Sequence, residues 1–210
     1  MTEDPVLTVL TRADSGSLTT AARVNQLLGR DESVQEDLLE TLIEAVSEDC
    51  ARWCNLAGDA PTFGLEALQA DWPEGCYRSS TILLPWRVPI VSIDEVTEAG
   101  TVLASTAYRL AGGGRLVRVS NCWASGALRV KYTAGWVLPD GAPAGLAGQV
   151  TEQVKFRLMA AKRDPALRSE TVPDVWAGTW NTPGGDMIAG NGFLPPLQAA
   201  LSSYRNWAVV

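Results

Sequence analysis

One helix signal, from Ser33 to Asn55, constrains the fold of this chain more than any other stretch. Apolar residues recur there mostly at steps of three and four, the spacing that places side chains on one side of an α-helix. Ser33 and Glu36 match the S-x-x-E capping box that opens helices. The residues expected in the buried stripe are Val34, Leu38, Leu39, Leu42, Ile43, Val46, Cys50 and Trp53.

The same stretch is unusually acidic. Residues 31–49 hold eight acidic side chains and no basic one. Glu36, Glu40, Glu44 and Glu48 fall four residues apart and form a second stripe, here called the glutamate stripe. Like charges at this spacing repel by about 0.2–0.5 kcal/mol per pair in an isolated helix. The stripe is either a solvated face, a contact for a basic surface, or the lining of a passage.

Other helices are predicted on both sides of a strand-rich region. A short helix starts with Ser17 as its N-cap and ends at Gly29, a residue suited to the C′ position. Pro143 opens a longer helix that runs to about Arg163, and Pro195–Tyr204 is a short helix with Pro at N1. Residues 56–80 are expected to be connective, with a short helical turn around Phe63, Leu65, Leu68 and Trp72.

Residues 81–137 have short alternating runs between turn residues, a pattern typical of antiparallel strands. The strands expected are 82–84, 90–97, 101–104, 108–110, 115–120 and 127–134. Gly112–Gly114 is expected to be a turn that tolerates positive φ. In the last strand Leu128, Val130 and Tyr132 should share one face.

Together these patterns predict an α+β protein: a helical bundle with an inserted small antiparallel β module and an extended C-terminal segment. Residues 1–16 form an N-terminal arm, in which Thr8–Leu10 either adds an edge strand or packs on a neighbour. The expected helical core is 17–80 with 138–163, the β module is 81–137, and 164–210 holds an extended loop and a C-terminal docking helix and tail.

The composition argues against several classes of function. A formal charge of −7 without a basic stripe is unlike proteins that hold nucleic acid. No signal-peptide pattern opens the chain and no stretch is apolar enough for a membrane span, so we expect a soluble protein made in a cytoplasm. Charged residues at 20% and hydrophobic ones at 46% predict a folded globular protein.

No catalytic constellation is recognisable. The chain has no His, which excludes Ser-His-Asp and Cys-His arrangements, and it has no phosphate-binding loop. A pair of catalytic carboxylates leaves no spacing signature and stays open as an alternative. Cys50, Cys54, Cys76 and Cys122 lack CxxC spacing, which favours small buried side chains over a four-thiolate zinc site. We predict no enzyme activity, no cofactor and no metal.

Three segments instead suggest contact with partners. Lys155, Arg157, Lys162 and Arg163 make the helix near 143–163 basic, so it can pair with the acidic helix within a subunit or between neighbours.

The Gly/Pro-rich connection 164–193 carries Trp176 and Trp180, which either anchor a partner or fold back onto the core of the chain. The apolar segment Trp207–Val210 is expected to need a binding groove.

The order of these segments resembles the head–tail connector (adaptor) proteins of tailed bacteriophages and related gene transfer particles. The resemblance spans roughly residues 30–210, and it is closest over 83–136, especially in PIVSIDEVTEAG and VKYTAGW. The acidic helix DLLETLIEAVSEDCARWCN precedes this part, and the ending LPPLQAALSSYRNW follows it. These phrases are structural and carry no catalytic signature.

The resemblance implies a non-enzymatic ring, usually of twelve copies, that sits beneath the portal and extends the DNA channel toward the tail. Its implied partners are other copies of the chain, the portal protein and a tail-side completion, stopper or terminator protein, with double-stranded DNA passing non-specifically and no membrane involved. The implied location is the head–tail interface of a virion made in a bacterial host cytoplasm.

In that family C-terminal segments commonly reach the portal. Carried to this chain, the implied portal-docking residues are Tyr204, Arg205, Trp207, Val209 and Val210, and the segment around Trp176 and Trp180 would contact the portal or a neighbour. A tail terminator ring is the main alternative, followed by a carbohydrate-binding module and an enzyme.

Overall fold

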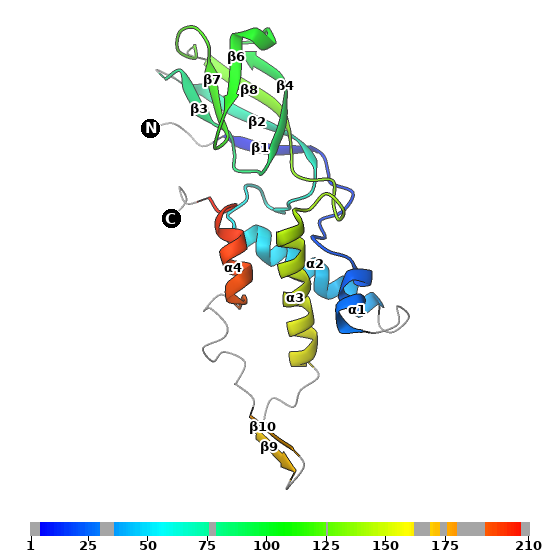
Figure 1. Cartoon of the computed structure of the whole chain (residues 1–210). Helices are drawn as coiled ribbons and strands as arrows, with labels where there is room; N and C mark the ends of the chain where they lie inside the picture. Colours follow the sequence, from blue (N-terminus) through cyan, green and yellow to red (C-terminus); the bar gives the residue numbers. More distant parts are fainter. Residues whose placement is uncertain are drawn as a thin grey trace. The chain divides into compact units, whose positions relative to one another are not determined.

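The computed structural model describes residues 5–29, 36–75, 79–124, 126–161, 169–172, 176–179 and 192–206. Over these ranges the protein is α+β, with four α-helices and antiparallel sheets, as Figure 1 shows. The chain divides into two compact units. We call residues 1–16, 51–141 and 205–210 the β unit, and residues 17–50 and 142–204 the helical unit. The β unit therefore extends beyond the predicted module 81–137.

Two antiparallel sheets make up the β unit. The larger one has the strand order β1-β2-β8-β4-β5, and the smaller one has the order β3-β7-β6. The strands of the larger sheet are β1 (Val6–Thr11), β2 (Glu66–Gly75), β8 (Gly126–Ala134), β4 (Ile90–Glu98) and β5 (Thr101–Val102). Those of the smaller sheet are β3 (Thr81–Leu83), β7 (Arg115–Arg118) and β6 (Tyr108–Ala111), and a 3-10 turn at Ser105–Ala107 precedes β6. Thus Thr8–Leu10 lies in an edge strand, one of the two roles considered for it.

The central strand β8 shows why this sequence forms a sheet. Leu128, Val130 and Tyr132 alternate along it and are buried, as the period of two predicts. They join one apolar core with residues from both sheets, among them Trp72 and Leu116. On the opposite face Arg129 Nε lies 2.6 Å from Asp71 Oδ1, and Lys131 Nζ lies 2.8 Å from Glu95 Oε1. These cross-strand ion pairs are partly exposed and set register more than stability.

The prediction for residues 56–80 is wrong in one respect. The short helical turn expected around Phe63–Trp72 is instead strand β2, which pairs with both β1 and β8. Leu65, Leu68 and Trp72 have helical spacing, but Glu66, Leu68, Ala70 and Trp72 are the buried set and follow a period of two. The small Ala70 and the charged Glu66 concealed that alternation.

The helical unit is built from α1 (Ala21–Leu28), α2 (Glu36–Trp53), α3 (Ala144–Ala161) and α4 (Pro195–Ser202). It is not a regular bundle. Both short helices, α1 and α4, pack on α3, whereas α2 crosses α3 steeply in Figure 1, unlike the near-parallel helices of a bundle. Its core residues are Val24, Leu39, Ile43, Val46, Val150, Val154, Leu158, Leu197 and Leu201.

The start of α1 corrects one further expectation. Thr20, and not Ser17, is the N-cap of α1, because its side chain accepts a hydrogen bond from Arg23 N. Leu18 N instead donates to Ser47 Oγ at 3.0 Å, which holds the preceding residues in a non-helical path. Gly29 ends α1 in the left-handed conformation, with φ of 64°, as predicted. Ser33 of the expected capping box lies outside the described residues.

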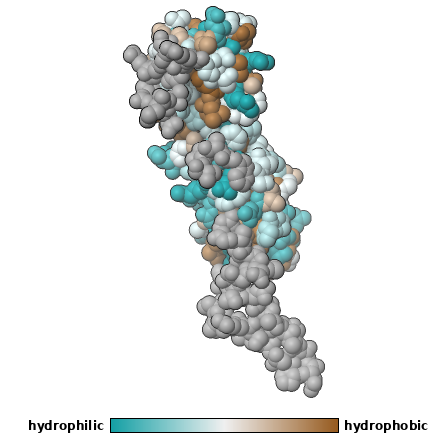
Figure 2. Space-filling model, turned by 90° about the vertical axis from the view of Figure 1, so that its left-hand side faces the viewer, coloured by the Kyte–Doolittle hydropathy of each residue, from teal (hydrophilic) through white to brown (hydrophobic). Residues whose placement is uncertain are grey.

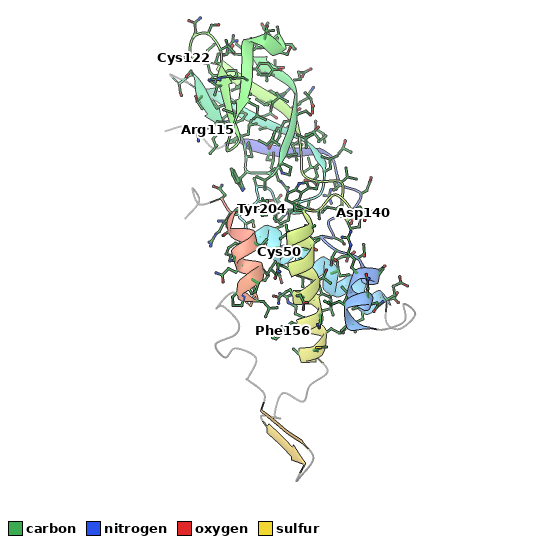
Figure 3. The ribbon with its side chains drawn as sticks, in the orientation of Figure 1. Cys50, Arg115, Cys122, Asp140, Phe156 and Tyr204 are labelled. Atoms are coloured by element: carbon green, nitrogen blue, oxygen red, sulfur yellow. The ribbon has the colours of Figure 1, made fainter. Side chains whose placement is uncertain are left out.

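Helix α2 buries a narrower stripe than expected. Leu39, Ile43, Val46 and Cys50 are buried, but Leu38 is 44% exposed. Adjacent residues of a helix point about 100° apart, so Leu38 and Leu39 cannot both face a narrow contact. Val34 lies outside the described residues. Cys50, labelled on α2 in Figure 3, and Cys54 are buried, as predicted. Cys122, also labelled there, is exposed, so the prediction of a small buried side chain is wrong for this residue. Cys76 lies outside the described residues.

The connection 164–193 contains regular structure. Strands β9 (Ser169–Val172) and β10 (Trp176–Thr179) pair antiparallel as a two-stranded ribbon. Within the described residues neither strand joins another sheet. The expectation of a connection without secondary structure is therefore wrong for these eight residues.

Candidate functional site

The glutamate stripe lies on the exposed side of α2. Glu36, Glu40, Glu44 and Glu48 are all exposed. Helical periodicity places them there, because residues four apart fall on one face. Glu36 also lies in the first turn, where the helix dipole favours a negative charge. The stripe is thus available to a partner surface, and its role remains a prediction.

The basic residues of α3 are partly engaged within the chain. Arg157 Nη2 lies 2.7 Å from Asp49 Oδ2, so the basic helix α3 is paired with the acidic helix α2. Lys155 Nζ lies 3.6 Å from Glu152 Oε2, one turn earlier. Both pairs are partly exposed, so each contributes about 0–1 kcal/mol to stability. Lys162 and Arg163 lie outside the described residues, and pairing between subunits remains a prediction.

A buried glutamine fixes the start of α4. Gln153 is fully buried on α3, where its Oε1 accepts a hydrogen bond from Leu194 N at 2.8 Å and its Nε2 donates to Gly192 O at 3.2 Å. Leu197 and Leu201 then bury the apolar side of α4. Gln153 was not among the residues predicted from sequence, although a polar residue beside the Val150–Val154 stripe was a usable signal.

The segment after α4 is anchored in the β unit. Arg205 lies over the ring of Trp53, with 4.6 Å between the guanidinium carbon and the ring centroid. Asn206 N donates to Cys54 O at 2.9 Å, and Asn55 Nδ2 donates to Asn206 O at 3.1 Å. Burial raises the pKa of the Cys54 thiol to about 12 although Arg205 opposes the shift, so the thiol is protonated at neutral pH. These contacts fix the position from which the following residues depart.

Of the predicted docking residues, only some are described. Tyr204, labelled in Figure 3, and Arg205 are half-buried within the chain. Trp176 begins β10, but its side chain is not described. Trp180, Trp207, Val209 and Val210 lie outside the described residues. The docking role of this set therefore remains a prediction.

A buried ion pair in the β unit escaped the sequence analysis entirely. Arg87 Nη2 lies 3.4 Å from Glu66 Oε2, with the two side chains only 3% and 6% exposed. Arg87 Nη1 also donates to Thr62 O at 2.9 Å, and Tyr132 Oη donates to Pro85 O at 3.2 Å. These contacts fasten the loop 84–90 to the larger sheet. No sequence pattern predicted this ion pair, because Glu66 lies in the segment that was expected to be connective.

The electrostatics of this pair are dominated by burial. Burial raises the pKa of the Glu66 carboxyl, and the Arg87 guanidinium opposes that shift. Burial also lowers the pKa of Arg87, opposed by Glu66, and raises that of Tyr132. Each group is therefore held in the fold at a desolvation cost, which makes the pair sensitive to the loss of either partner.

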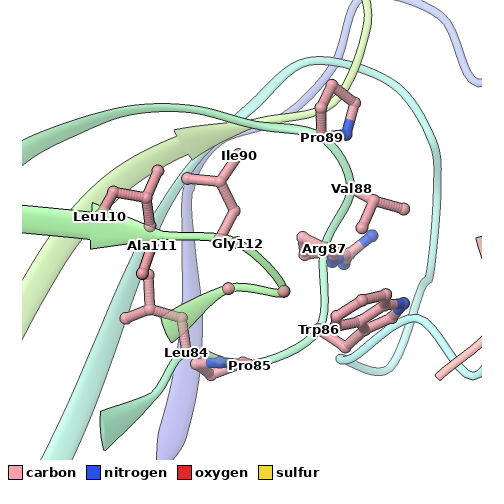
Figure 4. A pocket seen from close by; sticks show the side chains of 12 residues that line it. Leu84, Pro85, Trp86, Arg87, Val88, Pro89, Ile90, Leu110, Ala111 and Gly112 are labelled. Carbon is pink, nitrogen blue, oxygen red and sulfur yellow. The ribbon is translucent and has the colours of Figure 1, made fainter. Parts of the chain in front are cut away.

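A pocket of about 390 Å³ lies beside this loop, as Figure 4 shows. Loop residues 84–90 form one side of it, and Leu110 to Gly114, the end of β6 and the following turn, form the other. Its side chains are mostly apolar, with Pro85, Trp86 and Pro89 prominent. Figure 2 shows brown, hydrophobic side chains on the surface of the β unit, and exposed apolar residues there include Leu83 and Leu110.

The described residues offer little for chemistry. They contain no group of three or more Cys, Asp or Glu side chains placed to hold a metal ion. Among the helices that the structure describes, none is both long and apolar enough to cross a bilayer. The features that stand out among the described residues are the exposed glutamate stripe, a buried ion pair and an apolar pocket.

Neither a protein-family model nor a curated protein matches the sequence. Solved structures do match, and three of them each cover 98% of this chain and are covered to 97% themselves. One is in the neck of an empty gene transfer agent particle computed with C6 symmetry, with a TM-score of 0.52 and 16% identity. The chain has the fold of a gene transfer agent neck protein.

Two further matches agree. A chain in the neck of the native gene transfer agent particle, computed with C12 symmetry, has a TM-score of 0.52 and 14% identity. A chain in the virion of the native particle has a TM-score of 0.53 and 14% identity. At this identity the likeness concerns the fold, and it supports the resemblance to the head–tail connectors of phages and gene transfer particles.

Proposed function

We propose that this protein is a structural head–tail adaptor in the neck of a phage-like particle. It assembles into a ring beneath the portal, extends the DNA channel and provides the surface to which the tail attaches. The observation that carries this proposal is the fold likeness to gene transfer agent neck chains over nearly the whole length of both chains. The lack of a recognisable catalytic site is compatible with a role that depends on contact surfaces.

A ring requires two different faces on each subunit, which meet heterologously around the axis. The exposed glutamate stripe on α2 is one candidate face. The basic residues of α3 and of the sequence that follows it are another. Because Arg157 already pairs with Asp49 inside the chain, Lys162 and Arg163 are the better candidates for pairing between copies. Twelve copies is the proposed number, supported by the C12 symmetry of one matching neck structure.

The test is assembly with purified portal rings, followed by mass measurement and electron microscopy. We expect a ring of twelve copies bound to the portal. Adaptors of this kind can stay monomeric until they meet the portal, so the assay must include it. A six-fold ring that caps tail tubes would instead identify a tail terminator, and the absence of any ring with portal or tail tubes would refute both.

The glutamate stripe can be tested within the assembled particle. If Glu40 and Glu44 line the channel, Glu40→Lys with Glu44→Lys places positive charge beside passing phosphates and should slow DNA ejection. The matched control, Glu40→Gln with Glu44→Gln, removes charge without reversing it and should slow ejection less. Normal ejection from fully assembled Lys-variant particles would place the stripe away from the DNA path.

The C-terminal residues can be tested by truncation after Asn206. This removes residues 207–210 and keeps the Arg205 contact with Trp53 and the Asn206 contacts with Cys54 and Asn55. We expect a folded protein that no longer joins DNA-filled heads. Normal attachment by the truncated protein would refute portal docking by these four residues.

A further inference from the structure

The ribbon formed by β9 and β10 lacks the neighbouring strand that a pair of strands needs. Its two strands have four residues each and pair along their whole length, and Figure 1 shows them side by side. Over the part of the chain that the structure describes, neither strand belongs to a larger sheet. A two-stranded ribbon alone is only marginally stable in water, whereas three or more strands can be stable. The ribbon therefore gains stability if it adds to the edge of another sheet.

The two sheets of the β unit, as described, end in the edge strands β1, β5, β3 and β6. Strand β5 has two residues and β3 has three, so neither can pair along a four-residue strand. Strand β6 has four residues, but it carries the exposed Arg109, and a charged side chain is one device by which edge strands resist pairing. Three of the four edges are therefore short or charged.

Strand β1 is the least protected of these edges. It spans Val6–Thr11 without a charged side chain, and it leaves Val6 64% exposed and Leu10 50% exposed. An uncharged edge with exposed apolar side chains is a template for pairing with another chain. The register of β1 with β2 is regular from Val6 to Val9 and shifts after Val9. The regular part of β1 is thus as long as each strand of the ribbon.

The charges of the ribbon indicate which of its strands meets β1. Strand β10 has no charged residue, whereas β9 contains Glu170. An uncharged strand suits the uncharged β1, because pairing buries both strands and burial of a charge is costly. With β10 beside β1, β9 becomes the new edge of the larger sheet, and Glu170 is the kind of residue that blocks further pairing. The extended sheet then ends in a charged strand on this side and in the short β5 on the other.

We propose that β10 of one copy adds to the free edge of β1 in a neighbouring copy. The donor is a neighbour because, over the described residues, the ribbon joins no sheet of its own chain. The contact is heterologous, since the ribbon belongs to the helical unit and β1 to the β unit, and a ring is built from heterologous contacts. This inference rests on the proposed ring and names one contact that holds adjacent copies together.

Photo-crosslinking in the assembled ring tests this contact. Thr8 is exposed within the regular part of β1, so Thr8→p-benzoylphenylalanine places a reactive group at the proposed interface. Rings are assembled on portal from a mixture of unlabelled and nitrogen-15-labelled chains, and linked peptides are identified by mass spectrometry. We expect links to the peptide that contains 176–179, including links between a light and a heavy chain. Val102→p-benzoylphenylalanine, on β5 at a residue that is 61% exposed, is the matched control and should give no such link.

A charge on β1 gives a second readout. Thr8→Lys places an ammonium group where β10 would pack, so the protein concentration that half-saturates portal should rise about tenfold or more. Val102→Lys is the matched control and should change this concentration by less than about twofold, as expected for an exposed residue outside a contact. Both isolated variants should unfold at the temperature of the unsubstituted protein, which separates a lost contact from a lost fold.

Three results would overturn the inference, and each is distinguishable. Links to 176–179 that never join a light to a heavy chain would show that the ribbon adds to the β1 of its own chain. A complete ring in which residue 8 links to portal, or in which Thr8→Lys binds as the control does, would refute the contact and leave the proposed function standing. Failure of the unsubstituted protein to form any ring on portal would refute the proposed function and this contact with it.

Discussion

Removal of one member of the Glu66–Arg87 pair should destabilise the β unit strongly. The two side chains are almost completely buried, 3.4 Å apart, and Arg87 also donates to Thr62 O. Arg87→Met keeps much of the side-chain volume but leaves the Glu66 carboxylate buried without a cation. Breaking a buried pair in this way costs about 3–5 kcal/mol, so we expect the free energy of unfolding to fall by that amount at pH 7.

The cost should depend on pH with a defined sign. Burial raises the pKa of Glu66 and Arg87 opposes this, so Arg87→Met should raise that pKa further. A carboxyl whose pKa is higher in the folded state contributes stability below its unfolded pKa, and that stability is lost as the pH rises through the folded value. The destabilisation by Arg87→Met should therefore be larger at pH 7 than at pH 5.

Guanidinium chloride unfolding at both pH values measures this, with the circular dichroism of the sheet as the signal. Arg129→Met is the matched control, because Arg129 pairs with Asp71 at 2.6 Å but is 54% exposed, and an exposed pair contributes at most about 1 kcal/mol. The double variant Glu66→Leu with Arg87→Met should recover most of the loss. An unfolding midpoint of Arg87→Met equal to that of the control, or a loss that is the same at both pH values, would refute the reasoning.

Two further substitutions test local packing. Gly135 has φ of +109°, and an added Cβ would collide with the Gly64 carbonyl oxygen. Gly135→Ala should therefore lower the free energy of unfolding by more than about 3 kcal/mol, measured by thermal unfolding. The control Gly112→Ala, whose added Cβ meets open space, should lower it by less than about 1 kcal/mol. Gln153→Leu removes the acceptor for Leu194 N and should destabilise the helical unit by about 1–3 kcal/mol. An increase in thermal stability with Gln153→Leu would show that the hydrogen bonds of Gln153 do not hold α4.

The strands of 81–137 could be predicted from sequence because turn residues separate them. Gly112–Gly114 and the prolines near the start of β4 punctuate short alternating runs, and the observed strands follow those runs within a few residues. Strand β2 could not be found in the same way, because helical spacing and alternation compete at Leu65, Leu68 and Trp72. Tertiary pairing with β8 decides between them.

Among the candidate sites, features that depend on one helix could be predicted from sequence, whereas features that depend on tertiary packing could not. Exposure of the glutamate stripe follows from helical periodicity alone, and it was predictable. The Glu66–Arg87 pair joins residues 21 positions apart through the packing of a loop on a sheet, and no local pattern encodes it. The apolar pocket is likewise formed by loops that meet only in the fold.

The interleaving of the two units has a consequence for biosynthesis. The helical unit needs α4, which ends at Ser202, and the β unit needs Arg205 and Asn206 against Trp53, Cys54 and Asn55. A ribosome emits the chain from its N-terminal end, so the helical unit lacks part of its chain until Tyr204 has emerged, and the β unit lacks these contacts until Asn206 has emerged. Folding of both units is thereby tied to the last stage of translation, and neither unit can be completed by a truncated nascent chain that lacks α4 and the residues after it.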